Sequence, residues 1–352
     1  EKCPINGEMF TKTEKEIWAT RRPLGVMIEN HSEARPQSGL SYADVVYEAL
    51  AEGGITRFMG IFYCGAAASD VALGPVRSAR TYFLDWVSEY GMYPLYAHVG
   101  GANCNKTTGS GCQNGAKADA IGQIQKYGWN LYNDMNQMVG VDLGVKVFRR
   151  DNRLEKYTGN NNIAYEHTMY TSTDKLWDVA AKRGLNYVDD QTNEGWDADF
   201  VPWKFKADKL TAGADATSID YVFWDQFSDT YKVNWKYDPT KNIYLRSNGG
   251  QPHLDLETKQ QIGVTNVVLL FMKESRANDG YENNLHLLYE NKGKGTAYIF
   301  MNGKKIDAQW SKKDRASRMV FLDTKGKEIE LNPGKIWISV IPTQSMNKVV
   351  TM

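Results

Sequence analysis

The sequence predicts an α+β protein, with an N-terminal mixed α/β lobe around a central sheet and a mostly β C-terminal lobe built as a sandwich or curled barrel. Three observations support this prediction. Short apolar runs alternate with helix-period patterns over residues 21–200. After residue 205, aromatic and β-branched runs are separated by turn pairs such as Asn302-Gly303. The chain has 352 residues with 42% hydrophobic content, which is enough for a core in each lobe.

We therefore divide the chain into an N-terminal extension over residues 1–20, a mixed α/β domain over 21–200 and a mostly β domain over 201–352. Lys plus Arg and Asp plus Glu each number 42, which gives a formal net charge of +0. This balance provides no general attraction to nucleic acid or to an anionic membrane, so any anion site must be local. The apolar runs, such as Val267–Met272, are far shorter than the ~20 residues that a membrane-spanning helix needs.

The N-terminal lobe begins with a short apolar run, Leu24–Ile28, which predicts a buried strand. The two β-prone runs Val45–Glu52 and Ile55–Tyr63 flank a Gly-Gly pair and predict a hairpin. Because side chains alternate along a strand, Glu48 and Glu52 are expected on the same face of this hairpin.

The next stretch reads as the start of a helix over about Val76–Tyr90, with Pro75 in its first turn. Arg77 and Arg80 would then lie where the helix dipole disfavours cations. Two kinds of compensation remain open. One is a bound anion, held by the guanidinium groups and the free N–H groups of the helix. The other is an internal carboxylate, for which the candidates are Asp44, Glu48, Glu52 and Asp85.

A strand over Tyr93–Val99 follows and leads into Gly100-Gly101. Helix patterns then cover Lys117–Tyr127 and the stretch from Ser172 or Thr173 to about Arg183. If the strand is parallel to Leu24–Ile28, polar residues at the two strand ends meet at one sheet edge, where α/β sheets bind ligands. The glycine pair is no G-x-G-x-x-G or P-loop motif, so we expect no dinucleotide and no other cofactor.

The C-terminal lobe is predicted from its strand-like runs alone, and these are sufficient for a sandwich or a curled barrel. The runs are Tyr231–Tyr237, Asn242–Ser247, Asn266–Met272, Asn284–Glu290, Thr296–Met301, Lys304–Trp310, Arg318–Leu322 and Ile336–Ile341.

Four cysteines are present and none has C-x-x-C spacing. Cys104 and Cys112 flank a loop rich in glycine, threonine and asparagine, and a disulfide between them would restrain this loop. A second disulfide between Cys3 and Cys64 is one interpretation of the remaining pair, and a free buried thiol at Cys64 is the other. A disulfide would indicate an oxidising compartment.

Several motifs together resemble the signature of the YerB-like bacterial lipoprotein family, which is a two-domain family without an assigned activity. The N-terminal motifs are R-R-P-L-G-V-M-I-E-N-H, A-R-P-Q-S-G-L-S-Y-A-D-V-V-Y-E, E-G-G-I-T-R-F-M, G-P-V-R-S-A-R and H-V-G-G, over about residues 21–101. The C-terminal motifs are W-K-Y-D-P-T, Y-L-R-S-N-G-G-Q-P-H-L-D, N-V-V and L-N-P-G-K-I-W-I. The loop over Asn103–Asn114 departs from the shorter loop of the family, and we expect it to cover or reshape the site.

The resemblance implies an extracytoplasmic protein, either anchored by an N-terminal lipid on the outer face of the cytoplasmic membrane or secreted. Cys3 does not fit the lipid-bearing position, because it lies inside the present chain in the loop-like context C-P-I-N-G. The anchor would be the only membrane contact, and nucleic acid is excluded as a partner.

Our first functional hypothesis is a binding protein with an arginine-lined cleft in the N-terminal domain. Its ligand would be a small anionic or cell-wall-derived molecule, and an envelope protein is a further candidate partner. The ligand-binding residues would be Arg77, Ser78, Arg80, Asn30, Arg57, Glu52, His98, Gly100 and Gly101.

The alternative hypothesis is a cell-envelope hydrolase or lyase, with His98 or Glu52 as acid/base catalyst and Arg77 and Arg80 stabilising a developing anion. The sequence lacks a G-x-S-x-G elbow and an H-E-x-x-H motif, which weighs against it. Its five histidines have no ligand spacing, so no metal site is expected.

Overall fold

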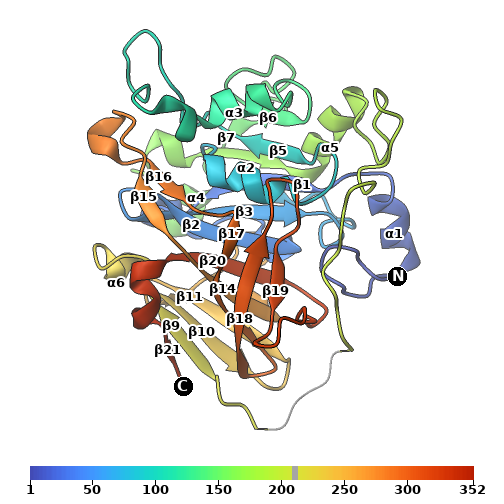
Figure 1. Cartoon of the computed structure of the whole chain (residues 1–352). Helices are drawn as coiled ribbons and strands as arrows, with labels where there is room; N and C mark the ends of the chain where they lie inside the picture. The colour runs from blue at the N-terminus through green and yellow to red at the C-terminus, as the bar shows by residue number, and fades with distance from the viewer. Residues whose placement is uncertain (208–212) are drawn as a thin grey trace.

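In the computed structural model, which describes residues 1–207 and 213–352, strands from both halves of the chain join one mixed sheet (Figure 1). Its strand order is β19-β18-β17-β14-β20-β2-β3-β1-β5-β6. The N-terminal half contributes β1 (Leu24–Glu29), β2 (Val45–Glu52), β3 (Ile55–Phe62), β5 (Leu95–His98) and β6 (Asp134–Asn136). The C-terminal half contributes β14 (Asn266–Met272), β17 (Gly293–Met301), β18 (Lys304–Lys312), β19 (Val320–Leu322) and β20 (Ile336–Pro342).

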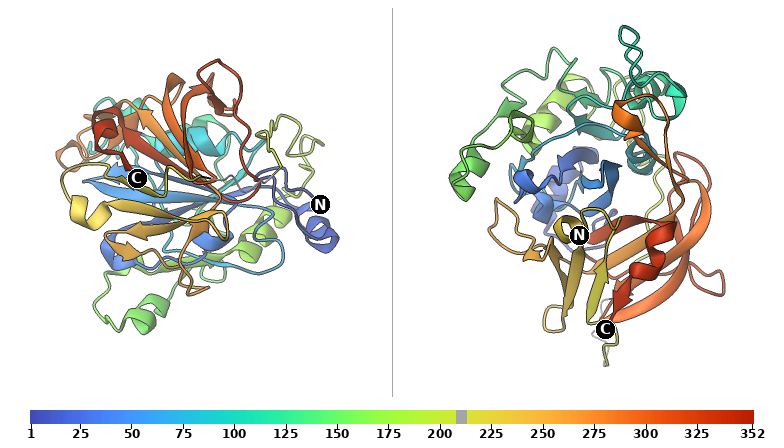
Figure 2. Two further views of the ribbon diagram at one scale, coloured as in Figure 1. Left: turned by 90° about the horizontal axis from the view of Figure 1, so that it is seen from below. Right: turned by 90° about the vertical axis from the view of Figure 1, so that its left-hand side faces the viewer.

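The two halves meet where β2 pairs in parallel with β20, from Val45 opposite Ile336 to Ala49 opposite Val340. Every residue of β20 is buried, and so are all but the last residue of β2. These strands are apolar because the sheet is covered on both faces here. Figure 2 shows strands of the N-terminal half (blue) and the C-terminal half (orange and red) in one layer.

A smaller sheet packs on the large one and is built from the C-terminal half. Its strands are β12 (Gln251–Pro252), β11 (Ile243–Asn248), β10 (Val233–Asp238), β9 (Ser218–Tyr221) and β21 (Val350–Thr351), with β13 (Gly263–Val264) beside β11. Between the sheets, the rings of Trp235 and Trp337 lie 5.5 Å apart, and the hydroxyl groups of Tyr221 and Ser339 lie 2.7 Å apart. The C-terminal strands therefore do not close on themselves as a separate barrel, because five of them (β14, β17, β18, β19 and β20) extend the N-terminal sheet.

The remaining elements cover the other face and the edges. Three short strands form a sheet, β4 (Ala72–Leu73), β8 (Met169–Ser172) and β7 (Arg149–Arg150), and β15 (Glu274–Arg276) pairs with β16 (Leu287–Tyr289). The helices are α1 (Lys12–Trp18), α2 (Thr81–Val87), α3 (Ala120–Lys126), α4 (Arg153–Thr158), α5 (Thr173–Lys182) and α6 (Ser228–Tyr231). Among the described residues, none of these helices has both the length and the apolar character to span a bilayer.

Several predictions are confirmed. The α+β class is correct, β2 and β3 form the expected hairpin, and β1 is the parallel neighbour of β5. Each of the predicted C-terminal strands is present, with shifted ends. Cys104 is bonded to Cys112, and Cys3 is bonded to Cys64, so Cys64 is no free thiol.

The predicted helix over Val76–Tyr90 is much shorter, because α2 begins only at Thr81. The residues before it are extended: Val76 forms a β-bridge with Ile28, and Ala79 forms one with Gly101. These bridges satisfy backbone groups that a helix would otherwise use. Arg77 thus lies outside the helix and Arg80 is its N-cap residue, so neither lies in the first turn.

The prediction that Glu48 and Glu52 share a face is wrong. A register shift between Leu50 and Glu52 inserts an extra residue into β2 opposite β3. Such a β-bulge changes the side-chain parity beyond it. Glu48 consequently faces the small sheet, where it contacts Arg246, whereas Glu52 faces the α2 side, where it contacts Arg80.

Candidate functional site

The arginines that the sequence placed at a helix start are paired inside the protein. Arg77 Nε lies 3.1 Å from Glu29 Oε1 at the end of β1. Arg80 donates to Glu52 Oε2, and Arg57 Nη2 lies 2.7 Å from Glu52 Oε1. Of the carboxylates proposed from the sequence, Glu52 pairs with Arg80. Glu29, which compensates Arg77, was not among them.

This arginine cluster fixes the ionisation of Glu52. Burial by itself would raise the pKa of the Glu52 carboxyl, but the charges of Arg57 and Arg80 outweigh it and hold that pKa far below its usual range. With Glu29, the cluster contains three guanidinium groups and two carboxylates, so one positive charge remains in excess. Its charges are therefore used mainly for internal pairing.

Ser78, Gly100 and Gly101 pack the neighbouring backbone segments against each other. The carbonyl oxygen of Ser78 accepts a hydrogen bond of 2.9 Å from Arg57 Nη1, and Ala79 N–H donates to Gly100 O at 3.0 Å. A Cβ at Gly101 would come within 2.9 Å of the Ile121 side chain. The glycine pair thus lets other segments of the protein's own chain approach it closely.

His98 has no free ring nitrogen. Its Nε2 lies 2.7 Å from Asp134 Oδ1, and its Nδ1 lies 2.6 Å from Gly100 O. The side chain is fully buried. In the hydrolase or lyase alternative, both His98 and Glu52 would have to leave these internal partners before they could touch a substrate.

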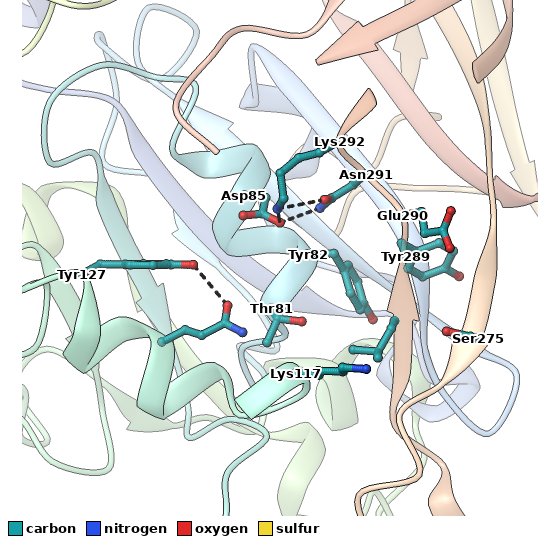
Figure 3. A pocket seen from close by; sticks show the side chains of 12 residues that line it. Thr81, Tyr82, Asp85, Lys117, Tyr127, Ser275, Tyr289, Glu290, Asn291 and Lys292 are labelled. Atoms are coloured by element: carbon teal, nitrogen blue, oxygen red, sulfur yellow. Dashed lines mark hydrogen bonds and ion pairs between the residues drawn. The ribbon is translucent and has the colours of Figure 1, made fainter. Parts of the chain in front are cut away.

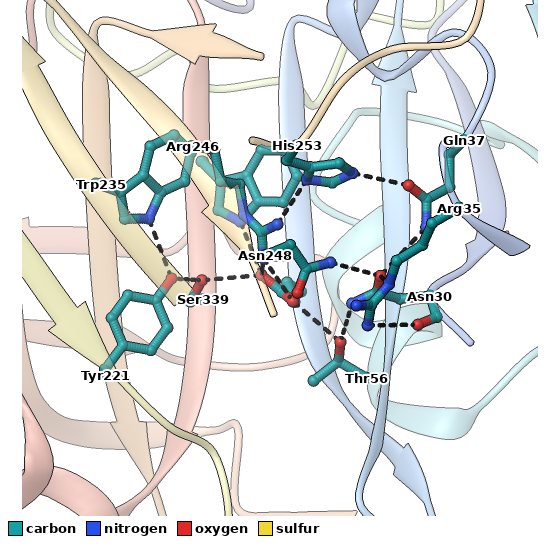
Figure 4. Close-up of polar contacts among 12 residues, drawn as sticks. Asn30, Arg35, Gln37, Thr56, Tyr221, Trp235, Arg246, Asn248, His253 and Ser339 are labelled. Atoms are coloured by element: carbon teal, nitrogen blue, oxygen red, sulfur yellow. Dashed lines mark hydrogen bonds and ion pairs between the residues drawn. The ribbon is translucent and has the colours of Figure 1, made fainter. Parts of the chain in front are cut away.

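Asn30 does not join the arginine cluster, and Figure 4 shows it among polar residues that include Arg246 and Asn248 of the small sheet. It follows Glu29 directly, and consecutive strand residues point to opposite faces. Its Nδ2 donates to Thr56 Oγ1 at 2.7 Å, and its Oδ1 accepts from Asn248 Nδ2 at 2.8 Å. The structure therefore brings together Arg57, Arg77, Ser78, Arg80 and Glu52, but it places Asn30 in the contact between the two sheets.

Beside this cluster, a pocket of about 560 Å³ opens between α2, α3 and the β15–β16 hairpin (Figure 3). We call it the α2 pocket. Thr81, the residue after Arg80, lies on its wall. The lining is Thr81, Tyr82, Asp85, Lys117, Gln123, Tyr127, Ser275, Leu288, Tyr289, Glu290, Asn291 and Lys292. Both halves of the chain contribute, because the hairpin lies beside α2 and away from the other C-terminal strands (Figure 1).

The polar groups of the α2 pocket converge from opposite walls. Asp85 Oδ2 accepts hydrogen bonds from Lys292 Nζ at 2.6 Å and Asn291 Nδ2 at 2.9 Å. On the facing wall, Tyr127 OH donates to Gln123 Oε1 at 3.3 Å. Lys117 is exposed and forms no ion pair with any residue that the structure describes. The pocket thus offers hydrogen-bonding groups, an aromatic ring and one uncompensated cation.

Tyr127 also borders a second hollow of about 210 Å³ beside the C-terminal end of α2. Here the Arg315 guanidinium stacks 4.1 Å from the centre of the Tyr127 ring, and its Nη1 donates to Ser88 Oγ at 2.8 Å. Within residues 1–207 and 213–352, no carboxylate pairs with Arg315. A second cation without a carboxylate partner among the described residues therefore lines the hollow that adjoins Tyr127.

The loop closed by the Cys104–Cys112 disulfide reaches the same region. Gln113 N–H donates to Asp279 O at 3.0 Å, and Asn114 Nδ2 donates to Asn278 O at 3.2 Å. Both acceptors belong to the connection between β15 and β16. The loop therefore braces the hairpin that forms one wall of the α2 pocket.

One trio could offer metal ligands, from one exposed, one half-buried and one buried side chain. Ligand atoms of His31, Glu33 and His167 lie within 4.8 Å of one another. The two imidazole rings, however, stack at 4.5 Å with an angle of 11° between their planes. Because a metal ion lies close to the plane of each imidazole that binds it, two parallel stacked rings cannot share one ion. The trio is thus not a preformed metal site.

Sequence reasoning missed Tyr127 and Lys292 in the α2 pocket and Arg315 in the adjoining hollow. Asp85 was considered only as a partner for the arginines, and its actual partner Lys292 is 207 residues away. No local pattern marks such a juxtaposition, since each residue reads as an ordinary helix-end or turn residue.

Known proteins resemble this chain over both halves. Residues 10–186 match the family described as "Protein of unknown function (DUF3048) N-terminal domain", and residues 223–338 match its C-terminal domain. A relative named "Putative lipoprotein YerB", from Bacillus subtilis (strain 168), is 29% identical over 341 residues, which cover 97% of this chain and 86% of the relative.

The fold agrees as well. The crystal structure of the YerB protein from Bacillus subtilis matches with a TM-score of 0.73 and 25% identity, covering 100% of this chain and 99% of that chain. The resemblance predicted from the sequence motifs is confirmed. The two disulfides fit a location outside the cytoplasm, where such bonds persist.

Proposed function

The chain belongs to the DUF3048 family of proteins of unknown function, and we propose that it binds an anionic, sugar-containing fragment of the cell wall across the α2 pocket and the adjoining hollow beside Tyr127. The name of the relative supports a place in the cell envelope, and the disulfides support an oxidising compartment. Cell-wall fragments are available to a protein in that place.

One observation carries the proposal. Lys117 lines the α2 pocket, Arg315 lines the adjoining hollow, and Tyr127 borders both. Neither cation has a carboxylate partner among the described residues. The arginines of the buried cluster, by contrast, are already paired with Glu29 and Glu52. A ligand carboxylate or phosphate would gain charge-assisted hydrogen bonds from the unpaired cations.

The rest of the α2 pocket suits a sugar. Asp85, Asn291 and Gln123 offer acceptors and donors for hydroxyl groups. The Tyr127 ring offers an apolar face against which a sugar ring can pack. A volume of about 560 Å³ lies within the range of small-molecule sites. This combination supports binding.

Isothermal titration tests the proposal with two probes, a soluble disaccharide–peptide fragment of peptidoglycan and the uncharged chitin disaccharide. We expect the charged probe to bind, and Lys117→Met and Arg315→Met each to weaken it about tenfold, as expected for a lost charge-assisted hydrogen bond. Lys313→Met is the matched control, because Lys313 is exposed and lines neither hollow. Equal binding of both probes, or equal loss in the control, would contradict the proposal.

Anchoring by a lipid is the second part of the proposal, and it rests on the name of the relative. The Cys3 sulfur is bonded to Cys64 and is not free to carry a thioether. Incorporation of labelled fatty acid into the gene product expressed in its own cell checks the anchor, and a Cys3→Ser variant should still be labelled.

A further inference from the structure

The loop over residues 138–145, which we call the 138–145 loop, exposes an unusual number of aliphatic side chains. Met138 is 67% exposed, Val139 51%, Val141 100% and Val145 76%. Single exposed apolar residues are normal on a protein surface, but four of them within one loop of eight residues point to something that covers the loop. This loop belongs neither to the α2 pocket nor to the arginine cluster.

The loop is firmly held, so the outward direction of these side chains is a property of the fold. Leu143 is fully buried in the core. Both carboxylate oxygens of Asp142 lie 2.7 Å from the guanidinium of Arg183 at the end of α5. Two backbone hydrogen bonds close turns in the loop, one from Val139 N–H to Asn136 O and one from Leu143 N–H to Gly140 O. Two inward anchors thus leave the four aliphatic side chains facing outward.

Basic residues follow the loop directly. Lys146 is exposed, and Arg150 stacks 3.3 Å from the centre of the Tyr165 ring. The Nη1 atom of Arg150 donates to Tyr165 O and to Thr168 Oγ1, which leaves its other donors for an external group. In the part of the chain that the structure describes, neither residue forms an ion pair. Asp142, the carboxylate within the loop, is already neutralised by Arg183. The 138–145 loop therefore presents an apolar tip, with the cations Lys146 and Arg150 following it in the chain.

The composition of the tip favours a lipid surface over a protein partner. Protein interfaces are enriched in Tyr, Trp, Phe, Met and Arg at their centres, and Val is under-represented among the residues that dominate binding energy. Three of the four exposed side chains here are Val, and none is aromatic. Peripheral membrane contacts combine apolar side chains at the headgroup boundary with nearby Lys and Arg.

We propose that the 138–145 loop inserts its aliphatic side chains into the interface of an anionic phospholipid bilayer, with Lys146 and Arg150 contacting lipid phosphates. This contact is independent of the ligand of the α2 pocket and of any N-terminal lipid. It would give a tethered protein a fixed orientation on the membrane rather than free rotation about its tether.

Sedimentation with vesicles tests the proposal, using the chain as described here without a lipid. We expect binding to vesicles of equal parts phosphatidylglycerol and phosphatidylcholine, and much weaker binding to pure phosphatidylcholine. Val141→Asp/Val145→Asp should abolish the binding. Lys146→Gln/Arg150→Gln should weaken it about fivefold per cation removed, with a reduced dependence on salt.

Met9→Asp is the matched control, because Met9 is similarly exposed at 69% and lies outside the loop. Its vesicle binding should equal that of the wild type. The proposal is overturned if the wild type ignores anionic vesicles, or if the loop variant binds as well as the control. It is also overturned if the loop variant merely converts a dimer into a monomer on size-exclusion chromatography, which would identify a second copy as the occupant. Thermal unfolding confirms that the variants are folded.

Discussion

Arg246 in β11 places Nη2 2.8 Å from Oε2 and 3.0 Å from Oε1 of Glu48 in β2, and neither side chain is exposed. This ion pair joins the small sheet to the large one and the C-terminal half of the chain to the N-terminal half. Trp337 Nε1 and Thr56 Oγ1 also donate to the Glu48 carboxylate. These groups all donate hydrogen bonds to the Glu48 carboxylate. The carboxylate depends on these donors because it has no access to water.

Arg246→Met should destabilise the protein by about 3–5 kcal/mol, because it leaves the Glu48 carboxylate buried without a counter-charge. Urea unfolding measures this free energy. The double variant Glu48→Gln/Arg246→Met should be more stable than the single variant, since the buried charge is then absent. If the double variant loses as much free energy of unfolding as Arg246→Met and Glu48→Gln lose together as single variants, the two residues are not coupled.

His253 should make the protein sensitive to mild acid. Burial first, and then the charges of Arg246 and Arg35, lower the pKa of His253 well below its usual range. Its Nδ1 faces Arg246 Nη1 at 2.6 Å, and its Nε2 faces Gln37 Oε1 at 2.7 Å. The neutral ring fits these partners, with Nδ1 as acceptor and Nε2–H as donor.

The direction in which stability changes with pH follows from proton uptake at His253. Below about pH 6.5 the unfolded chain binds a proton at His253 and the folded chain does not, so stability falls as the pH decreases, by up to about 1.4 kcal/mol per pH unit. Urea unfolding at pH 7.5 and pH 5.5 should show this loss in the wild type and a smaller loss in His253→Gln. Equal losses in the two proteins would assign the acid sensitivity to other groups.

The two disulfides should differ in their contribution to stability. Cys3 and Cys64 are separated by 61 positions in the sequence, whereas Cys104 and Cys112 are separated by 8. Cross-linking a longer loop removes more entropy from the unfolded chain. We expect Cys3→Ser/Cys64→Ser to lose about 4 kcal/mol and Cys104→Ser/Cys112→Ser about 2.5 kcal/mol in non-reducing urea unfolding. The reverse order would indicate that native contacts of the shorter loop dominate.

Local signals in the sequence predicted much of this fold. The β2–β3 hairpin follows from β-prone runs around Gly53-Gly54. Helix α5 begins at the predicted Thr173 and ends just before Gly184, although the Ser172 side chain makes no capping hydrogen bond. The Cys104–Cys112 disulfide follows from the composition of its loop. In each case the information lies within a few residues, and tertiary contacts agree with it.

Where sequence reasoning failed, distant contacts overrode a local signal. Pro75 suits a helix start, but bridges to Ile28 and Gly101 hold the following residues extended. The parity of Glu48 and Glu52 is lost at a bulge that no residue type announces. The α2 pocket depends on Asp85 meeting a hairpin from the other half of the chain, which periodicity cannot reveal.

Glu52 tests whether the arginine cluster has a structural role. Its pKa is held far below the ordinary value of 4.5, because Arg57 and Arg80 outweigh the effect of burial. A carboxyl with a depressed folded-state pKa stabilises the protein above the unfolded pKa, and this contribution is lost as the pH falls below it. The contribution should thus be complete at pH 7 and reduced at pH 3.

Glu52→Gln should therefore destabilise the protein by about 3 kcal/mol at pH 7, where Arg57 and Arg80 lose their shared counter-charge, and by clearly less at pH 3. Glu290→Gln is the matched control, because Glu290 pairs with Lys273 at the surface and exposed pairs contribute little. Urea unfolding at both pH values makes the comparison. A Glu52→Gln variant as stable as the wild type at pH 7 would mean that the two arginines do not need this carboxylate, and their role as receptors for an external anion would then regain support.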